Sequence, residues 1–306
     1  MRLVVDARTS AFAALVDYAG VFPPASLTVP DAVTGYRDAR SSDASWVAGR
    51  FLIRATQLAD LGAVAMTTMA SGEDPWEISV VFDTEASASA AMAQEFDREM
   101  DPAMTVSAAE APITDASEGG IRELYTTMSS INATVVPFLE VSRSEDVAAQ
   151  ISHIRDVAAA DHRTAGTKLR CGGVTADLFP TPARVARFIS SAVELGVPFK
   201  ATAGLHQPYR HFDEALGVYR HGFVNILMAT TAAADGADSA TVEAIVAESD
   251  AEGFSMSAAF GRWRDLSFPG SAIRRTRLSQ FVAYGSCDFN EPIDALTDLG
   301  MLGEGT

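Results

Sequence analysis

The chain contains two lysines, Lys168 and Lys200, in the segments "GTKLRCGG" (166–173) and "VPFKATAGLH" (197–206). All its other long-chain cations are arginines, within a total of 23 lysines and arginines. Abundant Ala, Arg, Asp and Glu indicate a GC-rich coding bias that favours arginine. Arginine cannot become a neutral amine, because its pKa stays above about 12. A lysine that is kept against this bias is therefore a candidate for amine chemistry.

Both lysines lie in segments that read as strands. Strand side chains alternate between faces, so Lys168 shares a face with Arg170, and Lys200 shares a face with Thr202. Two converging ammonium groups repel each other and lose hydration, so we expect the pKa of at least one lysine to fall. A neutral lysine can attack a carbonyl and form a Schiff base. The alternative is that each lysine pairs with a carboxylate such as Glu140 and only stabilises this end of the strands.

Eight strand-like segments alternate with amphipathic stretches, among them 181–196, 209–222 and 238–249, that read as helices. The strand-like segments are 12–20, 46–55, 76–83, 104–113, 133–142, 166–173, 197–204 and 223–233. Such alternation predicts an α/β fold with a parallel sheet, and eight units favour a (β/α)8 TIM barrel. No GxGxxG follows the first strand, which disfavours a dinucleotide-binding fold. We expect a barrel domain over 1–250 and a C-terminal extension, 251–306, packed on it.

The segment from Gly166 to Arg210 resembles the class I deoxyribose-phosphate aldolases. In that family a sixth-strand lysine begins "KTSTG" and forms the Schiff base, and a seventh-strand lysine begins "K-x-x-GG" and tunes the first. Here "KLRCGGVTADLFPTPARVARFI" followed by "GVPFKATAGLH" is similar in spacing and in the helix between. The resemblance implies that Lys168 is the Schiff-base residue and that Lys200 is its partner.

Four features depart from the family pattern. Thr-Ser-Thr is replaced by Leu-Arg-Cys at 169–171, which adds the cation of Arg170, and the paired glycines become Ala-Gly at 203–204. The Gly-Ala-Ser turn of the phosphate site becomes "MATTAA", where Thr230 and Thr231 are candidate hydrogen-bond donors. The fourth-strand carboxylate of the family's proton relay has only Glu110 as a counterpart. The resemblance therefore carries over the two-lysine chemistry and leaves the substrate open.

Further candidates lie at the ends of the expected strands, where barrel enzymes place their working residues. Glu140 interrupts the apolar run "VVPFLEVS", and Asp83 ends the third strand, although an aspartate there also serves as a helix cap. Either carboxylate is a candidate general acid or base. Arg54 is a candidate, with the arginine at 170, for clamping a carboxylate or phosphate. His206 follows the seventh strand, and Asp17 ends the first.

Composition excludes several classes of partner. The net charge is −17, which disfavours nucleic acid and anionic membrane surfaces. We see neither a signal peptide nor an apolar run long enough for a membrane span, and we expect a cytoplasmic setting in which Cys171 and Cys287 stay reduced. No HExxH, HxH or CxxC spacing is present, so we expect neither a metal nor another cofactor.

The sequence thus predicts a Schiff-base lyase that acts on a small anionic carbonyl compound, carboxylated or phosphorylated. The catalytic candidates are Lys168, Lys200, Glu140 and Asp83, and the substrate-binding candidates are Arg170, Arg54, Thr202, His206, Thr230 and Thr231. Two alternatives stay open. One is a barrel isomerase or metal-assisted hydrolase whose lysines act only through charge, with ligands from Cys171, His206, Glu140 and Cys287. The other is a non-catalytic barrel that binds sugar phosphates or carboxylates. A homo-oligomer is compatible with either.

Overall fold

Eight parallel strands close into a barrel, which confirms the predicted TIM-barrel fold. The structure is a computed structural model that describes residues 6–69, 72–142 and 146–302. The strands pair in the order β1, β2, β3, β4, β5, β6, β7 and β13, and β13 pairs again with β1. They are β1 (Val16–Tyr18), β2 (Ala48–Arg54), β3 (Trp76–Val81), β4 (Met104–Pro112), β5 (Val136–Glu140), β6 (Gly166–Arg170), β7 (Phe199–Thr202) and β13 (Phe281–Ser286).

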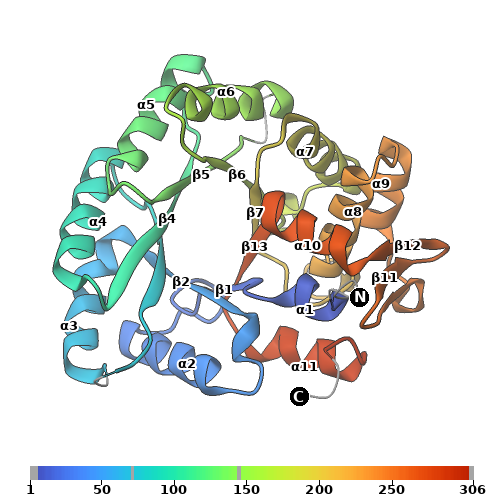
Figure 1. The fold of residues 1–306 in the computed structure, drawn as a ribbon, viewed down its shortest axis with the longest axis horizontal. Helices are drawn as coiled ribbons and strands as arrows, with labels where there is room; N and C mark the ends of the chain where they lie inside the picture. Colours follow the sequence, from blue (N-terminus) through green and yellow to red (C-terminus); the bar gives the residue numbers. More distant parts are fainter. Residues whose placement is uncertain (1–5, 70–71, 143–145, 303–306) are drawn as a thin grey trace, which may run out of the picture.

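Helices surround the barrel, because parallel neighbours need crossover connections. Figure 1 shows α2 to α7 following one another around the outside of the strands. The α-helices of the described residues are α1 (Ala7–Phe12), α2 (Val29–Ser41), α3 (Leu58–Thr68), α4 (Ala86–Met100), α5 (Glu118–Ser129), α6 (Val147–Ala160), α7 (Pro182–Leu195), α8 (Phe223–Ala234), α9 (Ser239–Ala247), α10 (Gly270–Ser279) and α11 (Asn290–Asp298). None of these helices is long and apolar enough to cross a membrane.

Local sequence explains where the helix beside the lysines begins and ends. The Thr181 side chain accepts a hydrogen bond from the backbone N–H of Arg184, and Pro182 supplies the first helical residue of α7. Gly196 ends the helix with a φ of 67°, a left-handed conformation that glycine adopts without steric cost. The chain then enters β7, the strand that carries Lys200, so local sequence defines the turn that leads into this strand.

The main apolar core lies between the strands and the helices. Phe199 of β7 packs outward, with its ring centroid 5.2 Å from that of Phe188 in α7 and 5.3 Å from that of Phe281 in β13. Because neighbouring side chains on a strand point to opposite faces, Lys200 must then face the barrel interior. The outer layer of aromatic and aliphatic side chains therefore fixes the inward direction of the residue that follows it.

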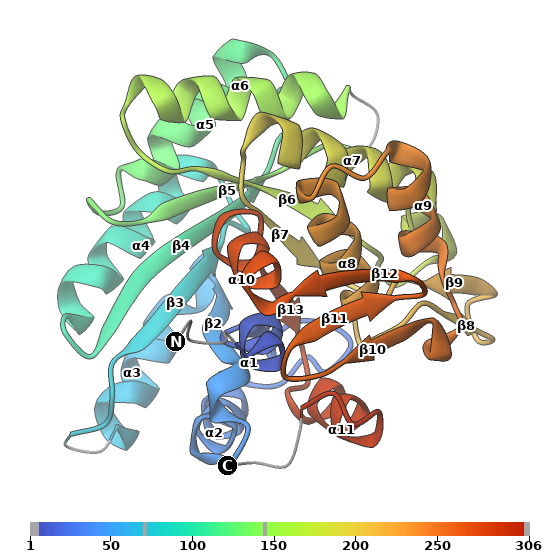
Figure 2. The same cartoon turned by 45° about the vertical axis from the view of Figure 1, so that its right-hand side comes forward.

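The eighth strand is not where the sequence pattern placed it. Residues 223–233 form α8, whose side chains are almost all buried, and β13 completes the barrel from within 251–306. An uninterrupted apolar run does not distinguish a buried strand from a buried helix, and the length of this one favours a helix. The remainder of 251–306 contributes α10, α11 and a three-stranded antiparallel sheet of β10 (Phe254–Met256), β11 (Phe260–Trp263) and β12 (Leu266–Pro269), which extends to one side in Figure 2.

Two further segments differ from expectation. Residues 209–222 were expected to form a helix, but they contain the antiparallel hairpin of β8 (His211–Asp213) and β9 (Val218–Arg220), with Gly217 at a φ of 65° in its turn. The first strand was expected over 12–20, but α1 occupies its beginning and β1 is limited to Val16–Tyr18. In both places an aspartate accepts a local hydrogen bond that favours the observed conformation: Asp213 accepts from the N–H of Leu216, and Asp6, the N-cap of α1, accepts from the N–H groups of Arg8 and Thr9.

Candidate functional site

The two lysines are register partners on neighbouring barrel strands. Lys168 of β6 lies opposite Lys200 of β7, and Glu140, the last residue of β5, lies opposite Lys168. Paired residues in a parallel sheet point to the same face. Since Leu169 and Phe199 belong to the outer core, both lysines project into the barrel interior, in agreement with the predicted alternation.

Glu110 of β4 bridges the two ammonium groups. Its Oε2 lies 2.9 Å from Lys168 Nζ, and its Oε1 forms an ion pair with Lys200 Nζ. Ser79 of β3 donates a hydrogen bond to the same Oε1 at 2.8 Å, and Lys200 Nζ donates to Ser79 Oγ at 3.2 Å. Glu110 is only 1% exposed. The fourth strand therefore supplies a buried carboxylate that contacts both lysines.

Asp17 of β1 pairs with Lys200 at the deeper end of this group. Its Oδ2 lies 2.5 Å from Lys200 Nζ, and its Oδ1 accepts a hydrogen bond of 2.7 Å from the backbone N–H of Arg50. This approach requires a glycine at 49, because a Cβ there would lie 2.5 Å from Asp17 Oδ1. Asp17 is fully buried, so its carboxylate is held by contacts within the protein.

Glu140 and Arg170 occupy the end of the group nearest to solvent. Glu140 Oε2 lies 3.2 Å from Lys168 Nζ, and Glu140 Oε1 accepts a hydrogen bond of 2.8 Å from Arg170 Nε. The Glu140 side chain is 13% exposed, whereas that of Arg170 is 42% exposed. We call the whole group the lysine network; it consists of Asp17, Glu110, Glu140, Lys168, Lys200 and Arg170.

The lysine network balances three carboxylates against three cations. Burial opposes ionisation of Glu110, but Lys168 and Lys200 outweigh it and hold the pKa of Glu110 well below its ordinary value. Burial likewise opposes the charge on Lys168, but Glu110 and Glu140 outweigh it and raise the pKa of Lys168 above its ordinary value. At Lys168 the direction is therefore opposite to the expected fall, because the neighbouring carboxylates exceed the repulsion between cations.

The network meets solvent at the carboxyl ends of the strands, where TIM barrels carry out their chemistry. The side chain of Lys168 is 8% exposed and that of Lys200 is 1% exposed, so Lys168 is the more accessible amine. Gly285 of β13, the register partner of Asp17, contributes no side chain. A Cβ there would lie 3.3 Å from Leu52 Cδ2 and 3.8 Å from Thr202 Oγ1, so a larger residue at 285 would crowd these side chains.

The turn after β7 keeps an unusual backbone despite the change from Gly-Gly to Ala-Gly. Ala203 and Gly204 have φ values of 60° and 74°, both in the left-handed region. This conformation costs an alanine about 1 kcal/mol. Gly204 also packs closely, because a Cβ on it would lie 3.0 Å from Phe179 and 3.3 Å from the Cα of Gly172. The loops after β6 and β7 therefore contact each other next to the lysines.

Arg54 and Asp83 stand apart from the network. Arg54 Nη1 donates to Val21 O at 3.0 Å and to Gln57 Oε1 at 3.2 Å, so it supports the loop after β1. Asp83 is exposed and accepts hydrogen bonds from the backbone N–H and the hydroxyl of Thr56. Within the described residues, neither side chain has a recorded contact with a lysine.

His206 and Thr202 lie close to the mouth in different roles. His206 Nδ1 is 2.9 Å from Glu291 Oε2, a contact that ties the loop after β7 to α11. Thr202 is the register partner of Arg170 and ends β7. Of these two residues, Thr202 is the one that faces the interior beside Gly285.

Thr230 and Thr231 do not reach the mouth. Both lie in α8, are buried, and donate their hydroxyl hydrogen bonds to Ile226 O and Leu227 O, at 2.7 and 2.8 Å. The expectation that they follow the eighth strand and bind substrate is therefore wrong, because the segment is a helix and its hydroxyls bond back to the preceding turn. Whatever anion site the barrel has must use other groups.

Two members of the site gave only weak sequence signals. Asp17 was noted as the end of a strand, and Ser79 was not singled out at all. Both interrupt apolar runs, "LVDYA" and "EISVV", in the same way as Glu140 interrupts its own strand. A polar residue within a buried strand needs a partner, and this signal identifies both positions.

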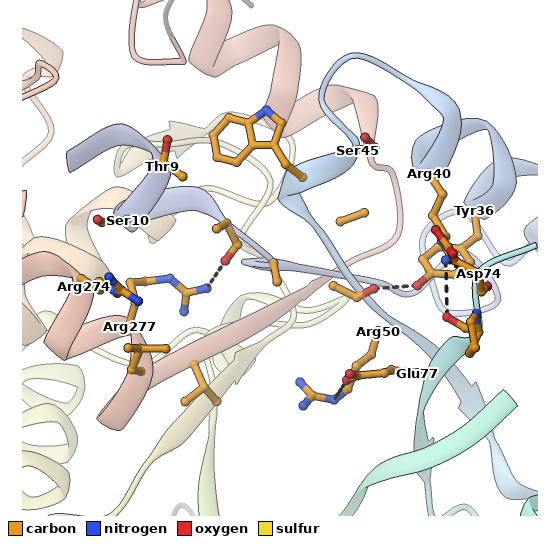
Figure 3. A pocket seen from close by; sticks show the side chains of 18 of the residues that line it. Thr9, Ser10, Tyr36, Arg40, Ser45, Arg50, Asp74, Glu77, Arg274 and Arg277 are labelled. Carbon is orange, nitrogen blue, oxygen red and sulfur yellow. Dashed lines mark hydrogen bonds and ion pairs between the residues drawn. The ribbon is translucent and has the colours of Figure 1, made fainter. Parts of the chain in front are cut away.

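A cavity at the opposite end of the barrel is a different feature. It has a volume of about 1040 Å³ and is lined by the first residues of β2 and β3 together with α1 and α10 (Figure 3). Its buried arginine, Arg277, donates to the carbonyls of Ala11 and Ala13 at 2.9 and 3.0 Å. Arg50 lies 3.5 Å from Glu77. These cations serve structural contacts, so the lysine network is the stronger candidate for chemistry.

Metal ligands do not converge in the part of the chain that the structure describes, where no three His, Cys, Asp or Glu side chains are grouped to hold an ion. Cys171 is fully buried, and burial raises the pKa of its thiol well above the ordinary value. No protein-family model, curated protein or solved structure shows a significant match to this chain. The candidate function therefore depends on the geometry of the lysine network.

Proposed function

We propose that this chain is a Schiff-base lyase that acts on a small anionic carbonyl compound, with Lys168 as the nucleophile and Lys200 as its tuning partner. The observation that carries the proposal is that Lys168, the more accessible lysine, has Glu110 Oε2 at 2.9 Å and Glu140 Oε2 at 3.2 Å from its Nζ. Two carboxylates are thus placed to accept the proton that a lysine must lose before it attacks a carbonyl.

Lys200 contributes charge and position. It pairs with Glu110 Oε1 and with Asp17, so the Glu110 carboxylate is shared between the two lysines and its effect on Lys168 is partly neutralised. Without this second cation, the pKa of Lys168 would be raised further and its neutral form would be rarer. The roles that we propose for the two lysines are those that the resemblance to class I deoxyribose-phosphate aldolases implies, and we assign Glu110 the role of that family's fourth-strand carboxylate.

Covalent trapping tests the proposal. The Lys168 nitrogen attacks the carbonyl carbon, the carbonyl oxygen leaves as water, and borohydride reduces the resulting iminium to a stable secondary amine. We expect small aldehydes and ketones to leave such an adduct on Lys168, detected as a mass increase of the intact protein. Cleavage after arginine separates the two lysines into peptides 164–170 and 188–210, so the site is assigned directly.

Lys168→Arg is the matched control, because it keeps the positive charge and removes the nucleophile. We expect it to abolish trapping on peptide 164–170. Lys200→Arg keeps the second cation and should slow trapping on Lys168 without moving the adduct. If no carbonyl compound in the panel leaves a reducible adduct on either lysine, the Schiff-base proposal is wrong.

The raised pKa of Lys168 favours one alternative, a barrel isomerase or binding protein in which the lysines act only through charge. An ammonium group held between two carboxylates is a good electrostatic partner for an anion or a developing oxyanion. In that case Lys168→Arg would retain ligand binding, and an isomerase would retain turnover, whereas the Schiff-base proposal requires the loss of covalent trapping and of turnover.

A further inference from the structure

Glu140 shares its carboxylate between the nucleophile and the most exposed cation of the network. One oxygen is 3.2 Å from Lys168 Nζ, and the other accepts from Arg170 Nε at 2.8 Å. A carboxylate that holds both groups links the state of Arg170 to the proton on Lys168. The inference below rests on the proposed Schiff-base function.

Arg170 is the cation that an approaching anion meets first. Its side chain is 42% exposed, against 8% for Lys168. It uses Nε for Glu140, and among the described residues no hydrogen bond is recorded for its two terminal nitrogens. A guanidinium presents a fork of donors that matches carboxylate and phosphate oxygens. The mouth of a strongly acidic chain thus carries a cation with donors free to take a substrate anion.

We propose that Arg170 and Glu140 select substrates by charge: the anionic group of a small carbonyl compound binds Arg170 and frees Glu140 to take the proton from Lys168. The anionic group, a carboxylate or a phosphate ester, must lie within a few bonds of the carbonyl. This short reach follows because Lys168 and Arg170 are two residues apart on one strand, about 7 Å between Cα atoms, and both touch Glu140.

Charge gives the direction of the effect. Burial opposes ionisation of Glu140, and Lys168 and Arg170 together hold its pKa below the ordinary value. An anion bound to Arg170 cancels part of that cation's influence, so Glu140 becomes a stronger base. The same anion also offsets the smaller lowering that Arg170 exerts on the pKa of Lys168. Glu140 is in direct contact with Arg170, at 2.8 Å, so the larger change falls on Glu140. The proton then moves from the Lys168 ammonium to the Glu140 carboxylate, and the neutral amine attacks the carbonyl carbon. The carbonyl oxygen takes one proton from the attacking nitrogen and one from the protonated Glu140 and leaves as water, and the iminium retains one positive charge.

Glu140 takes the proton from the reacting nitrogen of Lys168, so its effect must appear in the rate of the covalent step. A neutral carbonyl compound lacks the group that engages Arg170, and it meets a Lys168 that remains protonated. The preference for charge should therefore appear in the maximal rate of trapping as well as in the half-saturating concentration. A cation that only attracts the substrate would alter the half-saturating concentration alone.

The test uses two matched probe pairs on the full-length protein: pyruvate with pyruvamide, and glycolaldehyde phosphate with glycolaldehyde. Each pair keeps the carbonyl and changes the charge. We expect the charged member of at least one pair to trap on Lys168 at a maximal rate about tenfold or more above that of its neutral partner. The pair that shows the preference identifies the anion as a carboxylate or a phosphate ester.

Variants distinguish charge selection at the proton-transfer step from simple attraction of an anionic substrate. Arg170→Gln should lose the preference in both kinetic parameters, and Arg170→Lys should recover part of it. Glu140→Gln should lose the preference in maximal rate, keep it in the half-saturating concentration, and shift the pH profile of trapping to lower pH, because Lys168 loses one of its carboxylates.

The two ideas fail in different ways. If adducts form on Lys168 but the charged and neutral probes have maximal rates within twofold in the wild type, charge selection is wrong and the Schiff-base function stands. If no probe leaves an adduct on Lys168, the proposed function and the selection built on it both fail. The wild-type comparison decides the question even if Glu140→Gln does not fold.

Discussion

Removal of the charge on Glu110 is the sharpest test of the lysine network. In Glu110→Gln the new side-chain oxygen can still accept from Ser79 or Lys200, but its NH₂ group faces the ammonium of Lys168, which also only donates. The charges change from three carboxylates and three cations to two and three, so one buried positive charge loses its partner. Removing one member of a buried ion pair costs about 3–5 kcal/mol, and we expect the free energy of unfolding to fall by that amount.

Urea unfolding followed by circular dichroism measures the effect, and two variants control it. Glu118→Gln removes an exposed carboxylate that pairs with Arg122 on α5, and we expect a loss below about 0.5 kcal/mol. Adding Lys168→Met to Glu110→Gln restores the charge balance, so the double variant should lose less stability than the sum of the two single variants.

The coupling between the two positions should be at least about 1.5 kcal/mol if Glu110 and Lys168 are direct partners in a buried site. Two results would refute the reasoning. One is a loss below about 1 kcal/mol for Glu110→Gln, which would mean that water or another group compensates the lysines. The other is strict additivity in the double variant, which would mean that Glu110 and Lys168 do not depend on each other.

Two further predictions concern pH and packing. Because the pKa of Glu110 is lowered and that of Lys168 is raised, their mutual stabilisation is complete between about pH 5 and pH 10. This stabilisation is lost in acid as the pH falls through the folded-state pKa of Glu110, and in alkali as the pH rises through that of Lys168. The free energy of unfolding, measured across pH, should show this plateau, and Glu110→Gln should flatten its acid side. Gly49→Ala places a methyl group 2.5 Å from Asp17 Oδ1, so it should lower the free energy of unfolding by about 1–3 kcal/mol and slow trapping on Lys168. Denaturant unfolding measures the first effect, and the mass of the adduct measures the second. Unchanged values for both would show that Asp17 does not depend on this contact.

The sequence was sufficient to place the lysines because the relevant signals are local. Alternation along "GTKLR" and "VPFKAT" depends only on the two-residue period of a strand, and the caps at Thr181 and Gly196 bound the helix between the two strands. The succession of strands and helices likewise predicts a barrel before any contact is known. These features follow from short stretches of chain and do not need the rest of the fold.

The eighth strand could not be assigned in the same way. "FVNILMATTAA" and "FVAYGS" are both apolar, and only the closure of the barrel shows that Phe281–Ser286 pairs with β1 and β7 while 223–233 forms a buried helix. Because residues 223–233 were interpreted as the eighth strand, Thr230 and Thr231 were predicted to bind substrate. A tertiary constraint, the requirement that β1 and β7 share a neighbour, overrides local preference here.

The protonation of the lysines was also decided by the tertiary structure. The sequence determined which residues face inward and that two amines would be near each other, and from this it predicted a lowered pKa. It could not determine that Asp17 and Glu110, which are far from Lys200 in the chain, would meet its ammonium group, or that Glu110 and Glu140 would flank Lys168. A pKa depends on the charges within a few ångströms in space, and closure of the barrel brings those charges together.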